Sequence, residues 1–223
     1  MNPAFISWSG GKDCCLAGYL ATQNGLDARY LVNTVSEDGS RSRSHGISVD
    51  VIRAQAQVMD IPLIQQPTGK DDYEANFINV LRKLKQEGIN DGVFGDIDFN
   101  AHLEWIERVC KKSGMTPHLP LWEMSQKKIM EDFIKLGFVS VVVAVKPDPL
   151  GKEWLGRKLD DDFLNELEKL GDKVTLCGEK GEYHSLVIDG PLFKKRLEII
   201  EAEKVIRDGR WFLDIHRIEL KGK

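Results

Sequence analysis

The segment Ser7–Cys14 joins a predicted buried strand to a predicted helix through two adjacent glycines. An apolar run over 3–8 precedes the turn, and apolar residues follow it at helical spacing. Gly10 and Gly11 allow a sharp turn that brings backbone N–H groups close to an anion, and the helix directs its positive end at the same point. Lys12 adds a mobile positive charge. The arrangement predicts a phosphate site at the start of an α/β fold.

Two widespread phosphate loops share this order of strand, turn and helix, and residue spacing excludes both. The dinucleotide fingerprint G-x-G-x-x-G, counted from Gly10, would need a glycine where Cys15 stands, and the Walker pattern does not occur. The remaining motif is S-G-G-K-D-C, in which the Ser9 hydroxyl can contact a phosphate and the Asp13 carboxylate can help to hold Mg²⁺. The alternative is a glycine turn with a solvated Lys–Asp pair.

Composition narrows the class of protein. A length of 223 residues suits one large domain or two small ones, and no window approaches the roughly 20 apolar residues of a membrane span. We expect a cytoplasmic protein without a secretory signal. The four cysteines form no C-x-x-C pair and no metal-binding spacing, so we expect reduced thiols and no metal site of their own. Thirty-one basic against 35 acidic residues give a net charge of −4, which argues against a protein dominated by a nucleic-acid-binding face.

Strands and helices alternate up to about residue 120, which predicts a parallel sheet covered on both faces. The pattern then changes. A helix over 125–136, a β-forming run over 138–145, a turn-rich linker and a short acidic helix over 160–170 precede two β-rich runs. Those runs flank Asp208-Gly209, a strong tight-turn signal, and predict a hairpin.

Two loops should reach the edge of the sheet where the phosphate turn lies. The polar loop 36–46 ends in His45, which either faces the nucleotide cleft or is simply solvated. The predicted fourth strand ends in Gly95-Asp96, where the backbone can pass close to a ligand. Asp96 either contacts that ligand or caps the helix that follows.

The segment 177–193 places two glycines and two carboxylates before a predicted strand. It could bring Glu179, Glu182 and Tyr183 to a site for a polar substrate. The same composition is also typical of an exposed turn.

Two motifs together resemble a known family. The loop S-G-G-K-D-C at 9–14 resembles the PP-loop of N-type ATP pyrophosphatases, which split ATP between the α and β phosphates, although Cys14 stands where that family usually has serine. With G-E-K-G-E-Y at 178–183 and D-G-P-L-F at 189–193, the chain is similar to the diphthine-ammonia ligase family. Leu121-Trp122 and the L-G-x-x-L-D pattern at 155–160 extend the resemblance over nearly the whole chain. Lys180 and His184-Ser185 depart from the commonest eukaryotic form of the second motif.

The resemblance implies a fold and an activity. The fold is a HUP-like (Rossmann-like) parallel sheet with the PP-loop over 1–120, followed by a smaller α+β domain for substrate recognition over 121–223. The activity is that of an ATP-dependent amide ligase, which adenylates a carboxylate, releases pyrophosphate and forms an amide with ammonia. The acceptor is either diphthine on elongation factor 2 or a related unidentified carboxylate. ATP and Mg²⁺ are the expected cofactors, and a homodimeric assembly is left open.

The resemblance also assigns residues. Those expected at the nucleotide are Ser9, Gly10, Gly11, Lys12, Asp13, Cys14, His45, Gly95 and Asp96. Those expected at the acceptor are Glu179, Glu182, Tyr183 and His184. The expected catalytic residues are Lys12, Asp13 and Glu182.

Two other functions stay open on the sequence. One is ATP-dependent sulfur transfer to tRNA, which the missing cysteine pairs and the acidic charge weaken. The other is a nucleotide-binding sensor that does not turn ATP over. Pyrophosphate release with and without candidate carboxylates and ammonia separates an enzyme from a sensor.

Overall fold

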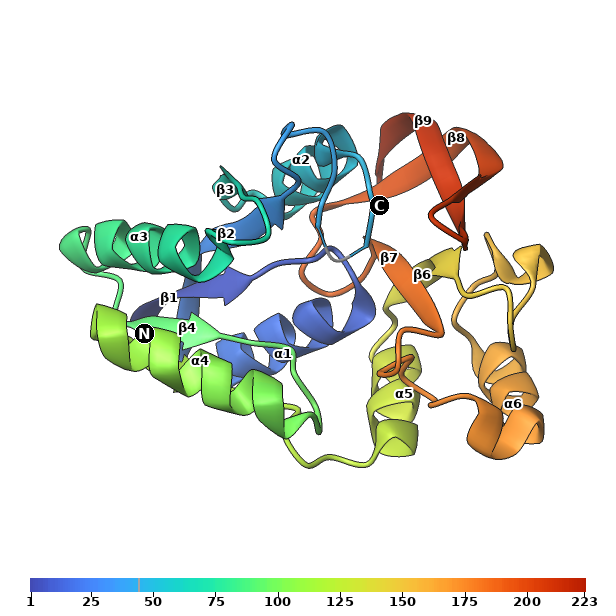
Figure 1. Ribbon diagram of the computed structural model, residues 1–223, viewed down its shortest axis with the longest axis horizontal. Helices are drawn as coiled ribbons and strands as arrows, with labels where there is room; N and C mark the ends of the chain where they lie inside the picture. The colour runs from blue at the N-terminus through green and yellow to red at the C-terminus, as the bar shows by residue number, and fades with distance from the viewer. Residues whose placement is uncertain (44) are drawn as a thin grey trace.

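The protein folds into two β-sheets with helices packed around them, as seen in a computed structural model (Figure 1). The structure describes residues 1–43 and 45–223, so Ser44, which belongs to the predicted loop 36–46, lies outside the described residues.

The first sheet has five strands, all parallel, in the order β3-β2-β1-β4-β5. The strands are β1 (Asn2–Ser7), β2 (Leu26–Val35), β3 (Leu63–Pro67), β4 (Asp91–Val93) and β5 (Thr116–His118). The central strand β1 pairs through Phe5 with Tyr30 of β2 and with Gly92 of β4. The parallel α/β sheet predicted from the alternating pattern is confirmed, and the strand order reverses beside β1, where open sheets bind ligands.

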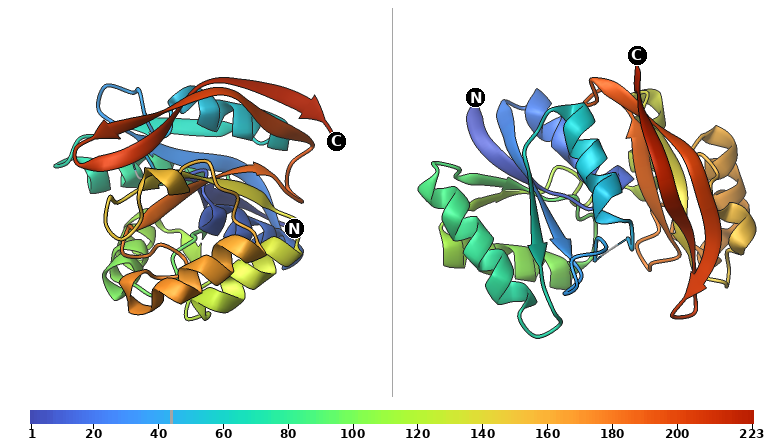
Figure 2. Two further views of the ribbon diagram at one scale, coloured as in Figure 1. Left: turned by 90° about the vertical axis from the view of Figure 1, so that its right-hand side faces the viewer. Right: turned by 90° about the horizontal axis from the view of Figure 1, so that it is seen from above.

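Four helices cover the two faces of this sheet. They are α1 (Lys12–Gln23), α2 (Val49–Met59), α3 (Tyr73–Gln86) and α4 (Asn100–Ser113). Helices α3 and α4 pack on one face, where Phe5 lies edge-on to both Phe77 and Phe94. Helices α1 and α2 cover the other face and lie between the two sheets (Figure 2). Within residues 1–43 and 45–223, no helix has both the length and the apolar character needed to cross a membrane.

The second sheet has four antiparallel strands in the order β7-β6-β9-β8. Its strands are β6 (Val139–Val145), β7 (Tyr183–Asp189), β8 (Lys195–Arg207) and β9 (Arg210–Gly222). Helices α5 (Gln126–Lys135) and α6 (Asp161–Leu170) pack beside it, with short 3-10 turns η1 (Lys152–Trp154) and η2 (Gly171–Lys173). The hairpin predicted at Asp208-Gly209 is confirmed, because both residues have positive φ angles (48° and 72°), as a type I′ turn requires.

The two sheets share one apolar core. Leu16 and Ile52 from the first part belong to the same buried cluster as Val142 and Leu186 from the second. Strand β7 lies against α1, and strands β8 and β9 lie against α2. The second sheet is therefore held against the helix that follows the glycine turn.

Candidate active site

A cavity of about 700 Å³ opens where β1, β2 and β4 end, and the loop before β7 closes its other side. Its wall combines the glycine turn, the ends of the parallel strands, the start of α4 and the segment 177–185. Residues that line it include Ser9, Lys12, Asp13, Cys14, His45, Tyr73, Gly95, Asp96, His102, Trp105, Cys177, Glu179, Tyr183 and His184. Most of the side chains predicted for the site therefore meet at one cavity.

The glycine turn is clamped from two sides. Gly10 has a φ of +85°, and a Cβ there would come within 2.7 Å of Gln55 Oε1 and within 2.6 Å of Ile52 Cδ1. The Gly10 carbonyl accepts hydrogen bonds from Gln55 Nε2 (3.0 Å) and from the Val187 N–H (3.0 Å). The Lys12 N–H, at the start of α1, donates to Ser185 Oγ (3.1 Å). Helix α2 and strand β7 therefore fix the backbone of the predicted phosphate loop.

Lys12 is only 3% exposed, and its ammonium group faces both halves of the site. Nζ donates to Asp13 Oδ2 (2.9 Å) and to the Cys177 carbonyl, and it lies 5.3 Å from the centre of the Tyr183 ring. Burial works against the charge, but Asp13 and the polar groups of Tyr183 and Cys177 hold the pKa of Lys12 well above its ordinary value. The lysine therefore stays protonated in the cavity.

The Oδ1 atom of Asp13 is placed where it could bind a cation. Asp13 Oδ1 is buried and has no hydrogen-bond partner within the described residues 1–43 and 45–223. A carboxylate oxygen is the type of ligand that Mg²⁺ prefers. The residues present at the turn therefore fit the expected ion.

Cys14 is hydrogen-bonded within the turn. Its Sγ donates to the Gly11 carbonyl (3.2 Å) and accepts from Ser9 Oγ (3.5 Å). Burial would raise the pKa of the Cys14 thiol, but hydrogen bonds from Cys15 and Ser9 bring it below the ordinary value. Cys14 thus occupies the serine position of the motif as a buried, hydrogen-bonded thiol.

The turn after β4 touches the phosphate loop directly. A Cβ on Gly95 would lie 2.7 Å from the Cys14 nitrogen and 2.8 Å from the Asp13 carbonyl carbon, so only glycine allows this approach. Asp96 lines the cavity and accepts a hydrogen bond from His102 Nδ1 (2.9 Å), while Phe99 occupies the N-cap position of α4. The Asp96 side chain therefore faces the cavity and does not cap α4.

The loop that ends in His45 also reaches the glycine turn. The His45 ring stacks on His184, with centroids 4.6 Å apart, and a Cβ on Gly11 would lie 2.3 Å from His45 Cε1. His45 Nδ1 donates to the Ser185 carbonyl (3.1 Å), because a carbonyl oxygen can only accept. Burial lowers the pKa of His45 to about 4, and Lys12 adds to that effect.

The segment before β7 places its two glutamates in different surroundings. Glu182, expected to be catalytic and to contact the acceptor, is not among the described residues that line the cavity. Its carboxylate is buried and accepts hydrogen bonds from the Thr175 N–H (2.6 Å) and Oγ1 (3.0 Å). That contact fixes the shape of the loop and turns the carboxylate away from the cavity, so the geometry lends no support to the predicted catalytic role of Glu182, which stays a prediction.

Glu179 is the glutamate of the motif that faces the cavity. Its side chain is exposed at the mouth, yet surrounding protein atoms displace enough water to raise the pKa to about 7, and Asp13 adds to the shift. Tyr183 presents its ring to Lys12, while its hydroxyl donates to the Leu176 carbonyl (2.7 Å).

Several residues of the site escaped prediction. Gln55 and Ser185 clamp the glycine turn, while Tyr73, Trp105 and His102 line the cavity. Gln55 left a weak signal, as a polar residue on the apolar face of α2 between Ile52 and Ala56. The others become visible only when the sheet is assembled.

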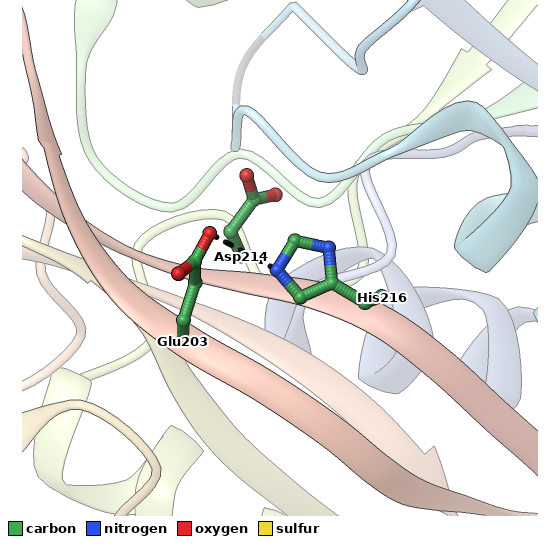
Figure 3. A group of neighbouring side chains, drawn as sticks. All are labelled: Glu203, Asp214 and His216. Atoms are coloured by element: carbon green, nitrogen blue, oxygen red, sulfur yellow. Dashed lines mark ion pairs between the residues drawn. The ribbon is translucent and has the colours of Figure 1, made fainter.

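A second group of ionisable side chains lies on the β8–β9 hairpin, where Glu203, Asp214 and His216 point toward one another (Figure 3). His216 Nε2 lies 3.1 Å from Glu203 Oε1. Asp214 is already paired, because Arg41 donates to both of its oxygens (2.9 and 3.1 Å) and Arg207 donates to one (3.2 Å). Two arginines already offset the charge of Asp214, so this cluster is explained as an ion-pair network that joins the hairpin to the loop 36–46.

Two family models together match most of the chain. Residues 2–117 match the family model described as "Diphthamide synthase N-terminal domain", and residues 125–220 match "Diphthamide synthase C-terminal domain". A diphthine–ammonia ligase of Schizosaccharomyces pombe is 30% identical over 88% of this chain, which spans 36% of that protein's length. A diphthine–ammonia ligase of Danio rerio is 28% identical over 93% of this chain and 90% of its own.

A solved structure from Methanocaldococcus jannaschii, described as a predicted subunit of tRNA methyltransferase, shares 13% identity with a TM-score of 0.49. It covers 86% of this chain and 98% of its own. With so low an identity and TM-score, this match does not bear on function.

Proposed function

The chain belongs to the diphthamide synthase family, and on that premise we propose that it is an ATP-dependent amide ligase. The reaction adenylates a carboxylate, releases pyrophosphate and forms an amide with ammonia. The observation that carries the proposal is that the PP-loop lysine contacts the family's second motif: Lys12 Nζ lies 5.3 Å from the centre of the Tyr183 ring and donates to the carbonyl of Cys177, which precedes the motif.

On the nucleotide side, the backbone of the glycine turn and the positive end of α1 receive the phosphates of ATP. Ser9 and Lys12 add a hydroxyl and an ammonium group, and Lys12 offsets the charge that develops on the leaving pyrophosphate. Mg²⁺ held by Asp13 would supply further charge neutralisation at the phosphates. The aromatic rings of Tyr73 and Trp105, whose centroids are 5.5 Å apart, form a wall of the cavity that is suited to a purine ring.

On the acceptor side, Glu179 and His184 present polar groups to the same cavity from the segment before β7. We assign the first sheet, within residues 1–120, to ATP and the second part, residues 121–223, to the acceptor. Diphthine on elongation factor 2 is the acceptor that the relatives' names suggest, and a related carboxylate is the alternative. A cytoplasmic setting suits the four free thiols.

The test compares Lys12→Ala with Lys111→Ala, a control lysine exposed on α4. Calorimetry measures ATP affinity, and a coupled assay measures pyrophosphate release with ammonia and candidate carboxylates. A charge-assisted contact to phosphate in a sheltered site is worth about 2 kcal/mol, so Lys12→Ala should lose about 30-fold in turnover while the control stays near the parent.

Two results would contradict the proposal. Equal turnover by Lys12→Ala and the parent would show that the loop does not act on phosphate. Tight ATP binding by the parent, without pyrophosphate release for any carboxylate tested, would favour the nucleotide sensor.

A further inference from the structure

The turn between β4 and α4 carries a histidine–aspartate pair that faces the cavity. His102 lies in the first turn of α4, and its Nδ1 donates to Asp96 Oδ1 at 2.9 Å. The Phe99 ring meets the imidazole edge-on, with centroids 4.8 Å apart. Both members of the pair line the cavity. The imidazole is therefore oriented by a carboxylate on one side and an aromatic ring on another.

The pair lies close to the phosphate loop. Gly95, which precedes Asp96, packs against the backbone of Asp13 and Cys14 so tightly that no Cβ fits. Asp96 is near enough to Asp13 to raise the pKa of that carboxyl, although burial is the largest cause of the shift. His102 and the residues of the phosphate loop therefore line the same cavity.

The hydrogen bond to Asp96 sets the tautomer of the ring. Because the carboxylate accepts, Nδ1 carries the proton, and the neutral ring keeps a lone pair on Nε2. The His102 side chain is 60% exposed, so ammonia arriving from solvent can reach Nε2. A base held by an orienting carboxylate is the usual arrangement for proton removal from a nucleophile.

The second half of the proposed reaction needs such a base. Ammonia attacks the carbonyl carbon of the acyl adenylate, a C–N bond forms, and AMP leaves with the electron pair of the broken C–O bond. The nitrogen must then lose one proton to yield a neutral amide. We propose that His102 Nε2, oriented by Asp96, accepts that proton. The inference rests on the proposed function.

The other histidines of the cavity are poorer candidates. His45 is stacked on His184 and packed against Gly11, and burial lowers its pKa to about 4. Burial lowers the pKa of His184 well below its ordinary value, and His45, Arg210 and Lys12 lower it further. By contrast, the hydrogen bond to Asp96 raises the pKa of His102 against partial burial, and the charges of Asp96 and Glu179 add to the shift.

The test uses His102→Gln with a matched control, His118→Gln. His118 also pairs with an aspartate, through Nε2 to Asp91 Oδ1 at 2.7 Å, and among the described residues it is not part of the cavity wall. Exchange of labelled pyrophosphate into ATP with the acceptor present reports adenylation, and a separate assay measures amide formation at saturating ATP. A general base contributes about 10² to 10⁴ in rate.

We expect His102→Gln to keep pyrophosphate exchange within about threefold and to lose amide formation by about 100-fold or more. His118→Gln should leave both unchanged. Amide formation at the parent rate in His102→Gln would overturn the proposal, and so would an equal loss of exchange and amide formation. If the parent itself performs no exchange with any carboxylate, the proposed function fails instead.

A pH profile checks the role independently of folding defects. The charged groups that face His102 are Asp96 on its own turn and Glu179 on the loop before β7. At a constant concentration of free NH₃, amide formation should rise with pH through the pKa of His102 and then level off. Asp96→Asn removes the group that raises this pKa, so the rise should move to lower pH at whatever rate the variant retains. An unmoved rise in Asp96→Asn would overturn the assignment.

Discussion

Replacing the buried Gln55 should show how much its hydrogen bonds to the glycine turn contribute to stability. The Gln55 side chain is fully buried and makes three hydrogen bonds: it accepts from Trp8 Nε1 (3.1 Å) and donates to the carbonyls of Gly10 (3.0 Å) and Val187 (2.7 Å). Gln55→Leu preserves approximate size but removes all three. The Gly10 carbonyl keeps its bond from the Val187 N–H, whereas Trp8 Nε1 loses the acceptor that Gln55 provides.

The expected loss of stability follows from these contacts. Three hydrogen bonds at about 1 kcal/mol each give about 3 kcal/mol, and a buried donor left without a partner adds to this. The added apolar contact of leucine offsets part of the loss. Against a total stability of about 5 to 15 kcal/mol, the shift in urea midpoint should be readily measured. ATP affinity should fall as well, because the Gly10 carbonyl loses one of its two donors.

The control is Gln57→Leu, on the same helix but exposed. A surface substitution of this kind changes stability by about 0.5 kcal/mol or less. Urea unfolding of both variants at constant m-value gives the comparison. Equal midpoints for the parent and Gln55→Leu, or an equal loss in Gln57→Leu, would refute the assignment of Gln55 as the residue that holds the turn.

Two further predictions concern the same cavity. Hydrogen bonds within the turn lower the pKa of the Cys14 thiol, and this thiol should be alkylated more slowly when ATP is saturating. Mass spectrometry measures the labelling rate, with Cys110 as the internal reference. Labelling of Cys14 at the same rate with and without ATP would place it outside the nucleotide site. Burial lowers the pKa of His45 from 6.5 to about 4. Between these pH values the histidine is protonated in the unfolded chain but neutral in the folded chain, so protonation favours unfolding. Stability attributable to His45 should therefore be intact above pH 6.5 and decline toward pH 4 in thermal melts, and a His45→Gln variant with the same pH dependence as the parent would contradict the assignment.

Predictions from local sequence succeeded where the cause was local. Gly10 at a φ of +85° and the Asp208-Gly209 turn both depend on conformations that few residues adopt, so their positions could be recognised from neighbours alone. The alternation of strands and helices likewise follows from apolar spacing. Lys12 and Asp13 are placed by the helix that begins at Lys12, which made the turn from strand to helix predictable.

The residues that escaped prediction, and the different surroundings of the two glutamates, follow from how the chain folds and not from a local pattern. Glu179 and Glu182 look alike in the sequence, and only the fold of the loop before β7 decides that Glu182 turns to Thr175 while Glu179 faces the cavity. A one-residue change of register reverses the faces of a strand, and the β6–β7 pairing contains two irregularities. Ser185 contacts Lys12 across 173 positions, a relation that no local pattern carries.

These long-range contacts qualify the expectation that one half of the chain serves ATP and the other serves the acceptor. The carbonyl of Gly10, the N–H of Lys12 and the ammonium of Lys12 all bond to groups in the second half, at Val187, Ser185 and Cys177. Movement of the segment 177–187 on binding an acceptor would therefore change the phosphate loop itself. Since the Cys177 carbonyl shares the Lys12 ammonium with Asp13, that segment can influence how strongly the lysine engages phosphate. Under the proposed function, the two substrates would thus be coupled through these three contacts, and a variant would separate their effects only where its side chain lies outside them.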